Sequence, residues 1–186
     1  MNETWSAYYD ATTDKPLHPL LISLEPYLPK SGLAVDLGCG VGIGTKFLLE
    51  HGLQVIAVDA EAEAFDRMGD LACTRVCSSF SDFKFPACDV VVAQFSLFFL
   101  SDGEFREFWP RLTQALKPGG LFCGQLLGRN DDWVSRGYSA YTDSEVRQFL
   151  EAFDILSYEE ADRDGQTSLG ESKHWHVFHI IARKLG

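Results

Sequence analysis

Two segments of the sequence carry residue types that suit a charged ligand with a ribose. Residues 36–44 read DLGCGVGIG, with glycine at every second position from Gly38, and the apolar run at residues 54–58 is followed by Asp59. Glycine lacks a Cβ and tolerates positive φ, so such a turn lets a ligand lie directly against the backbone. The Asp59 carboxylate can accept hydrogen bonds from both hydroxyls of a ribose. We therefore expect a ligand site between these two segments.

The glycine spacing disfavours a nicotinamide dinucleotide as that ligand. Its fingerprint is G-x-G-x-x-G. Counted from each of the first three glycines, the last position of the fingerprint is occupied by Ile43, Thr45 or Phe47. Asp36 would also repel a pyrophosphate, whereas it suits a ligand that carries an ammonium or a sulfonium group.

The elements that must position these residues follow from the alternation of short apolar runs with amphipathic ones. The apolar runs predict strands at residues 33–37, 54–58, 72–77, 89–93, 121–127, 155–160 and 175–183. Helices are predicted over residues 16–28, through residues 47–49 up to Gly52, over residues 61–68, and from the capping boxes that begin at Ser101 and Thr142.

Two breaks in this pattern carry further expectations. Pro110 is expected to kink the helix that begins after Ser101 or to mark a second start, and residues 117–120 are expected to form a turn. The last two strands have no helix between them and predict an antiparallel pair. Elsewhere the alternation predicts a parallel sheet with helices on both faces, and such a sheet places its ligand beyond the carboxyl ends of its strands. The chemistry is therefore expected just after the first, second and fourth strands.

Residues 34–42 (AVDLGCGVG) resemble the first motif of class I S-adenosylmethionine-dependent methyltransferases. Residues that resemble the later motifs of that family follow in order and at fitting intervals, at 55–59, 88–94 and 116–122. The resemblance covers residues 33–127 closely and the rest of the chain in pattern only. It implies an α/β fold, a doubly wound Rossmann-like methyltransferase sheet of seven strands with the last antiparallel and helices on both faces.

The same resemblance implies one methyltransferase domain over residues 1–186. Residues 1–30 would form an N-terminal lid or helix region, residues 31–127 the cofactor-binding core, and residues 128–186 the substrate-side part. The cofactor would be S-adenosylmethionine, and S-adenosylhomocysteine would be the product.

The resemblance also assigns roles around the glycine turn. Asp36 would support the turn and the amino-acid end of the cofactor, while Gly38 and Gly40 would let the backbone pass close to its methionine and ribose portions. Asp59 would accept the ribose hydroxyls, although an ordinary helix N-cap is the alternative reading of this residue. Cys39 stands where the family often has cysteine and is interpreted as a small packing residue rather than a nucleophile.

Further cofactor contacts are implied after the second, third and fourth strands. Ala60 would lie against the adenine. Asp82 and Phe83 resemble a family pair that contacts the adenine, with a solvated loop residue as the alternative for Asp82. Gln94 and Phe95 would face the reactive end of the cofactor.

The acceptor side is expected to need positioning more than a nucleophile, because the sulfonium methyl group is already activated. A base is needed only where the acceptor must lose a proton. His174 and His176 share one face of the last strand and form the candidate catalytic base or oxyanion-binding pair, whereas His179 takes the other face. Further candidates for acceptor contacts are Tyr8, Tyr9, Phe98 and Arg129.

Two of these candidate groups have structural alternatives. Tyr8 and Tyr9, together with Trp5, fold over the site as a lid or pack against the edge of the sheet. Phe98 and its aromatic neighbours belong to the acceptor site or to the core.

The function implied is transfer of the methyl group of S-adenosylmethionine to a small-molecule acceptor by in-line displacement. The alternative is a non-catalytic regulatory module that binds S-adenosylmethionine or S-adenosylhomocysteine. The short chain, the aromatic start and the ending at residues 180–184 resemble the small tellurite-resistance-like branch of the family. That branch methylates small, soft nucleophiles such as chalcogen oxyanions or thiol-like compounds.

The composition adds expectations about partners and compartment. With 16 Lys and Arg residues against 27 Asp and Glu the net charge is −11, which disfavours nucleic acid as a partner. No apolar run approaches the roughly 18 residues of a membrane span, and the start does not resemble a signal peptide. The five cysteines show no zinc-site spacing, so we expect free thiols in a cytoplasmic protein and no metal. Monomer and homodimer both stay open.

Overall fold

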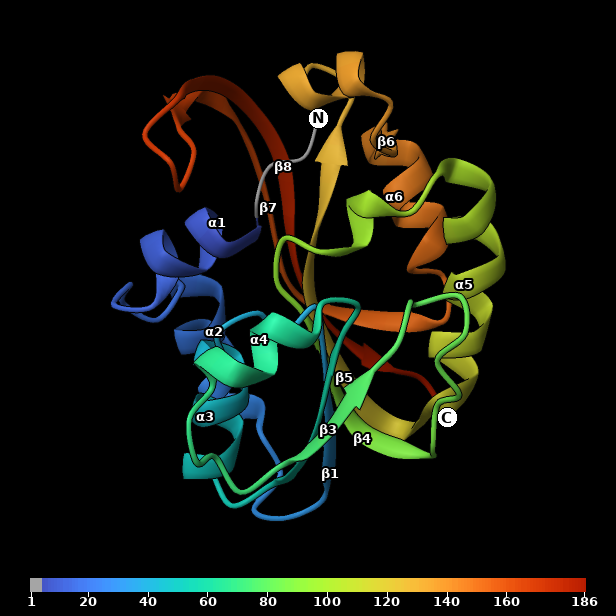
Figure 1. The fold of residues 1–186 in the computed structure, drawn as a ribbon. Coiled ribbons are helices and arrows are strands. Elements are labelled where there is room, and N and C mark those ends of the chain that lie inside the picture. Colours follow the sequence, from blue (N-terminus) through green and yellow to red (C-terminus); the bar gives the residue numbers. More distant parts are fainter. Residues whose placement is uncertain (1–4) are drawn as a thin grey trace.

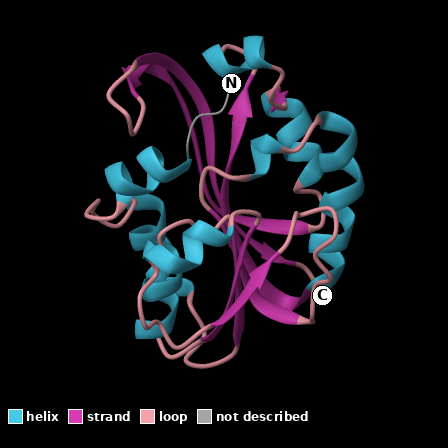
Figure 2. Ribbon diagram, in the orientation of Figure 1, coloured by secondary structure: helices cyan, strands magenta, loops and turns pink. Residues whose placement is uncertain are grey.

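A twisted sheet runs through the molecule with helices on both of its faces, as Figures 1 and 2 show. The structure is a computed structural model and describes residues 5–186, so the first four residues of the expected N-terminal region lie outside it. The strands are β1 (Leu33–Leu37), β2 (Gln54–Asp59), β3 (Thr74–Cys77), β4 (Cys88–Ala93), β5 (Leu116–Gly128), β6 (Ala140–Tyr141), β7 (Phe153–Gln166) and β8 (Ser172–Lys184).

The strand order is β3-β2-β1-β4-β5-β8-β7, and β6 adds a short pairing to β5 outside this path. Strands β1 to β5 run parallel to one another, whereas β8 is antiparallel to both β5 and β7. The seven-stranded path with its last strand antiparallel is therefore confirmed. The two-residue strand β6, which runs parallel to β5, was not expected.

Two apolar layers join the helices to the sheet. Leucines and a phenylalanine of α2 (Pro19–Leu24) and α3 (Ile43–Glu50) pack on one face, and aromatic and aliphatic residues of α5 (Asp102–Ala115) and α6 (Asp143–Phe149) pack on the other. The remaining helices are α1 (Trp5–Thr12) and α4 (Ala62–Arg67), with short 3₁₀ turns η1 (Glu25–Tyr27), η2 (Leu97–Phe99) and η3 (Asp132–Arg136). Helices therefore lie on both faces of the sheet, as expected.

The structure changes several expected boundaries. The helix expected over residues 16–28 is the shorter α2 followed by η1, whose second residue is Pro26. Helix α5 begins at its predicted capping box and keeps Pro110 inside it without a second start. Residues 117–120, expected as a turn, belong to β5, where the pairing with β4 shifts its register between Cys88 and Val90.

The hairpin of β7 and β8 is longer than its apolar runs. Pairing continues to Gln166 opposite Ser172, so most of the polar stretch expected to separate the strands lies within them. The ladder hydrogen bonds of this ribbon do not require apolar side chains, which is why hydrophobicity underestimated its length. No helix within residues 5–186 combines the length and apolar character of a membrane span.

Candidate functional site

The glycine turn after β1 crosses directly onto the end of β2. The backbone N–H groups of Gly38 and Cys39 both donate to the Val58 carbonyl, at 2.8 and 3.1 Å. Gly38 has φ of +68°, and a Cβ placed on it would lie 2.5 Å from the Cβ of Ser96. Ser96 in turn donates its hydroxyl to the Leu37 carbonyl at 2.8 Å. Glycine is therefore required at position 38, and the turn is pressed against the segment that follows β4.

Asp59 at the end of β2 completes this cradle. Its Oδ2 accepts the Gly40 N–H at 2.9 Å, and its Oδ1 accepts the Glu61 N–H at 3.0 Å. The N-cap of α4 is Glu61, so the alternative reading of Asp59 as an ordinary N-cap is wrong. Burial raises the pKa of the Asp59 carboxyl, although the hydrogen bonds from these N–H groups lower it in part. Each oxygen keeps a lone pair, which suits the two hydroxyls of a ribose.

Asp36 lies behind the turn and supports it. Its side chain is fully buried and accepts the Thr45 hydroxyl at 2.7 Å. Burial raises the pKa of the Asp36 carboxyl to about 6, while the hydrogen bond from Thr45 lowers it. A Cβ on Gly44 would approach the Asp36 carboxylate at 3.1 Å, so α3 begins close against this group. This is the supporting part of the expected role; the contact with the amino-acid end of a cofactor stays a prediction.

Cys39 and Ala60 occupy the two sides of this junction. The Cys39 thiol is buried 3.9 Å from the Met68 sulfur, and burial raises its pKa, which fits a packing residue. Ala60 is exposed, and its carbonyl accepts the Cys77 thiol at 3.5 Å.

The segment after β3 is arranged differently from the expected adenine pair. Asp82 is exposed and closes a local turn with the Ser79 hydroxyl at 2.7 Å. Phe83 is buried in the core against Phe85, with ring centroids 4.8 Å apart. Phe80, which the sequence did not single out, lies 3.5 Å from the Cβ position of Gly38. An adenine contact by Asp82 and Phe83 stays a prediction.

Gln94 and Phe95 stand directly after β4, beside the turn. Phe95 has φ of +49°, the only positive φ of a non-glycine residue within residues 5–186. Its N–H donates to the Gln125 Oε1 at 3.0 Å. The buried Nε2 atoms of Gln94 and Gln125 have no hydrogen-bond partner among residues 5–186. A strained backbone beside unpaired buried amides is typical of a functional site.

Helix α1 lies over the glycine turn. Tyr9 is 2% exposed, and its ring comes within 3.9 Å of the Cβ position of Gly40. Burial, with a further contribution from the Asp59 charge, raises the pKa values of Tyr8 and Tyr9. Arg67 of α4 pairs with Asp10 and donates to the Ser6 hydroxyl at 3.1 Å.

On its other side, α1 touches the segment after β4. The rings of Trp5 and Phe99 meet edge to face with centroids 5.4 Å apart. The helix therefore spans from the element after β2 to the element after β4. The expected alternative of packing against a sheet edge does not describe this placement; opening and closing as a lid stays a prediction.

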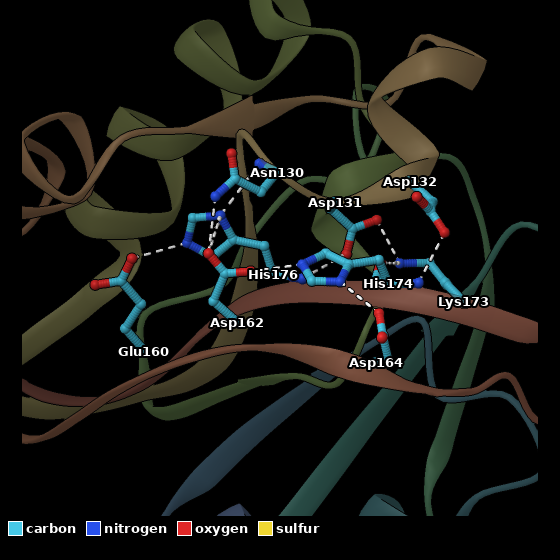
Figure 3. Close-up of polar contacts among 9 residues, drawn as sticks. All are labelled: Asn130, Asp131, Asp132, Glu160, Asp162, Asp164, Lys173, His174 and His176. Atoms are coloured by element: carbon cyan, nitrogen blue, oxygen red, sulfur yellow. Dashed lines mark hydrogen bonds and ion pairs between the residues drawn. The ribbon is translucent and has the colours of Figure 1, made fainter.

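His174 and His176 lie among acidic residues of β7 and the loop before η3 (Figure 3). The two ring nitrogens of His174 lie 2.7 Å from Asp164 and 2.6 Å from Asp162. His176 Nδ1 accepts the Asn130 N–H at 3.1 Å, which leaves its Nε2 to donate to Glu160 at 2.8 Å. None of these contacts involves the glycine turn, Asp59 or Phe95. A catalytic role for the pair stays a prediction.

A buried ion pair fixes the same loop to β8. The Lys173 ammonium pairs with Asp131, and their side chains are 2% and 0% exposed. The ammonium also lies over the rings of Trp175 and Trp133, 3.7 and 4.7 Å from their centroids. Asp131 further accepts the backbone N–H groups of Trp133 and His176, at 3.0 and 3.1 Å. The buried Asp131 carboxylate thus takes part in both an ion pair and hydrogen bonds with the backbone.

The two remaining predicted acceptor residues are engaged elsewhere. Arg129 is exposed and pairs with Glu145 of α6 at 3.1 Å. Phe98 is fully buried, and its ring packs against Trp133 at a centroid distance of 5.5 Å. Phe98 therefore belongs to the core, as its alternative reading had it, and acceptor contact by either residue stays a prediction.

Sequence reasoning missed four residues that gather around Phe95, namely His18, Gln125, Trp175 and His179. One of them carried a signal, because Gln125 is a polar residue inside an otherwise apolar strand. His18 carried none, since it lies more than a hundred residues before its ring partner His179.

Comparisons with known proteins agree with this geometry. A family model described as a methyltransferase domain matches residues 34–120. The cypemycin N-terminal methyltransferase of a Streptomyces species is 31% identical over 129 residues, which cover 64% of this chain and 53% of that protein. This chain spans about half the length of the curated relatives it matches.

Solved structures show the same fold. TehB from Haemophilus influenzae superposes with a TM-score of 0.80 at 14% identity, over 95% of this chain and 65% of that one. The 1,6-didemethyltoxoflavin-N1-methyltransferase of Burkholderia thailandensis superposes with a TM-score of 0.73 at 21% identity, over 97% and 85% of the two chains.

Residues 34–120 are therefore similar to a methyltransferase domain, and the fold and glycine turn of the chain resemble those expected of class I S-adenosylmethionine-dependent methyltransferases. The superposition with TehB shows a shared fold, and membership of the small tellurite-resistance-like branch stays a prediction. S-adenosylmethionine is the cofactor of this class, and S-adenosylhomocysteine is its product.

Proposed function

We propose that this chain transfers the methyl group of S-adenosylmethionine to a small-molecule acceptor. The observation that carries the proposal is the cradle at the ends of β1 and β2. There Gly38 has a positive φ and no side chain to cover its backbone, and the Asp59 carboxylate accepts the Gly40 N–H at 2.9 Å. The same turn touches Ser96, so the acceptor side begins next to it.

The residues of the cradle fit the cofactor. Asp59 would accept the ribose hydroxyls with its remaining lone pairs, and Gly38 and Gly40 would admit the methionine and ribose portions. The bound cofactor supplies an electrophilic methyl group on a sulfonium. Asp36 holds the turn from behind through Thr45, and Tyr9 covers it from the solvent side. Holding the reactants in place is worth on the order of 7–11 kcal/mol of the barrier.

A small-molecule acceptor is supported by charge and by a relative. The net charge of −11 opposes the approach of a nucleic acid. The Burkholderia thailandensis protein was crystallised with 1,6-didemethyltoxoflavin and S-adenosylhomocysteine. Action in the cytoplasm as a monomer or homodimer remains part of this proposal. The candidate base pair of His174 and His176 does too.

The proposal is tested by transfer of an isotope-labelled methyl group from S-adenosylmethionine to a panel of small thiols, selenite, tellurite, carboxylates and flat nitrogen heterocycles. We expect labelled product with at least one acceptor. Gly38→Ala should lower transfer about a hundredfold or more, because its Cβ displaces the segment at Ser96. Gly69→Ala is the matched control, since Gly69 has φ of +60° with nothing within 4 Å of its Cβ position.

Two outcomes would contradict the proposal. Binding of S-adenosylhomocysteine without transfer to the panel or to any compound of a cell extract would favour the non-catalytic module. Equal transfer by the Gly38→Ala and wild-type proteins would show that the cofactor lies elsewhere.

A further inference from the structure

Gln125, near the carboxyl end of β5, has a buried side-chain amide whose Nε2 lacks a partner within residues 5–186. The residue is 0% exposed, and its Oε1 accepts the Phe95 N–H at 3.0 Å. That bond fixes the orientation of the amide and leaves both hydrogens of Nε2 without an acceptor in the part of the chain that the structure describes. A buried donor without a partner is costly, so a ligand atom that accepts a hydrogen bond would be stabilised here.

Aromatic side chains surround this amide on the same face of the sheet. His179 lies directly opposite Gln125 in the β5–β8 ladder, and Trp175 follows on the same face of β8. The Phe95 ring lies edge-on to His18 and to Trp175, with centroids 5.4 and 5.7 Å apart. All four rings, of His18, Phe95, Trp175 and His179, are only half-buried, so parts of their surfaces stay accessible to a flat ligand.

The two imidazoles of this group stack on each other. Their centroids are 5.5 Å apart and their planes are 20° from parallel. Two charged rings would repel in this arrangement, and burial lowers the pKa of both, that of His18 to about 4. The Nδ1 of His18 accepts the Leu20 N–H at 3.1 Å, which assigns its proton to Nε2. The stack is therefore neutral at pH 7.

The charged groups near this face do not supply a site for an anion. Lys173 is neutralised by buried Asp131. On β7, Arg163 lies opposite Trp175 and Glu159 lies opposite His179, and their effects on the His179 pKa oppose each other. Because the charges of Arg163 and Glu159 offset each other at His179, this face offers no net positive charge to compensate an anionic acceptor for its lost hydration.

We propose that Gln125, His179 and His18, with the rings of Phe95 and Trp175, form the acceptor site, and that it takes an uncharged, flat heterocycle with a ring carbonyl and an adjacent N–H or O–H. This inference rests on the proposed function. The carbonyl accepts from the Gln125 amide, and the ring lies among the aromatic side chains. Phe95 and Ser96 link this site to the glycine turn.

The site also contains a base for the proton that such an acceptor releases. The acceptor heteroatom forms its new bond to the methyl carbon with its own electron pair, and the pair of the broken carbon–sulfur bond stays on sulfur. The proton of the acceptor N–H or O–H passes to a ring nitrogen of His179. Within residues 5–186 no hydrogen bond engages these nitrogens, whereas both nitrogens of His174 have carboxylate partners.

Calorimetry on the full chain saturated with S-adenosylhomocysteine tests the inference. The probes are lumazine, a flat heterocycle with ring carbonyls and N–H groups, and two anions, benzoate and selenite. We expect lumazine to bind at least tenfold more tightly than either anion. Gln125→Glu, which keeps an acceptor for the Phe95 N–H but removes the amide donors, should weaken lumazine at least tenfold. His179→Gln should do the same, and His51→Gln, at the C-cap of α3, is the matched control.

The two proposals fail in different ways. Loss of S-adenosylhomocysteine binding in the wild-type protein would overturn the proposed function. Absent lumazine binding, equal binding of an anion, or unchanged lumazine affinity in both the Gln125→Glu and His179→Gln variants would overturn this inference while S-adenosylhomocysteine still binds. Affinity for S-adenosylhomocysteine should stay within about twofold in these variants, because neither residue touches Asp59 or the glycine turn.

Discussion

Strand β8 carries three histidines, and its two faces give them different surroundings. On one face His174 and His176 meet the carboxylates of Glu160, Asp162 and Asp164. On the other face His179 stacks on His18 beside Phe95. Ion pairing favours the protonated ring of His174, whereas burial among aromatic rings favours the neutral ring of His179.

This difference shows that the type of a residue does not determine its role. His174 and His176 have partners for all four ring nitrogens and hold the hairpin of β7 and β8 together. The ring of His179 lies beside an unpaired amide, and among the three histidines it is the one whose ring nitrogens have no hydrogen-bond partner within residues 5–186. The following changes test that division.

The largest effect is expected where the loop before η3 is anchored to β8. Lys173→Met should lower the free energy of unfolding by about 3–5 kcal/mol, because it leaves the Asp131 carboxylate buried without its cation. Lys46→Met is the matched control: Lys46 and Glu50 are exposed and 3.9 Å apart, and the loss should stay within about 0.5 kcal/mol. Urea unfolding measures both. Equal stabilities of the two variants would show that the anchor is not energetically important.

The stacked pair of His18 and His179 should make the free energy of unfolding fall as the pH is lowered. The pKa of His18 is about 4 in the folded protein, below its ordinary value of 6.5, so the unfolded chain takes up the proton first. This contribution is present above pH 6.5 and is lost as the pH falls toward 4. His18→Gln should therefore remove about 1–2 kcal/mol of the destabilisation between pH 7 and pH 5. An unchanged pH slope in urea unfolding would mean that the ring is protonated in the fold.

His174, which is paired with Asp162 and Asp164, should give the free energy of unfolding the opposite dependence on pH. Hydrogen bonds to Asp164 and Asp162 raise the pKa of His174. Its stabilising contribution is therefore present below the unfolded value and is lost as the pH rises through the folded one. His174→Gln should be less stable than the wild type near pH 5 and similar to it near pH 9. A variant that is equally destabilised at both pH values would contradict the charged assignment.

The cofactor side of this molecule could be predicted from sequence because its contacts are made by neighbouring segments and by backbone. Gly38, Asp36 and Asp59 all lie in or directly beside one turn. The glycine pattern of the sequence already predicts that turn. The parallel sheet with helices on both faces followed from the alternation of strands with helices. The resemblance of four motifs to a known family then supplied the ligand.

The acceptor side could not be predicted in the same way. Which face of β8 carries His179 followed from alternation, but that this face meets His18 depends on packing between residues more than 150 positions apart. Likewise, no pattern in residues 159–164 showed that their carboxylates would engage His174 and His176 across the ladder. The polar residue Gln125 in an apolar strand was the one local signal.

The central claim is that the cradle of the glycine turn and Asp59 holds the adenosyl cofactor. Calorimetric titration of S-adenosylhomocysteine into the wild-type, Asp59→Ala and Asp66→Ala proteins tests it most directly. The account predicts binding to the wild type, a loss of about 1.5–3 kcal/mol for Asp59→Ala because charge-assisted hydrogen bonds to the ribose disappear, and no change for exposed Asp66→Ala on α4. Absence of binding to the wild type, or equal affinities for all three proteins, would contradict it.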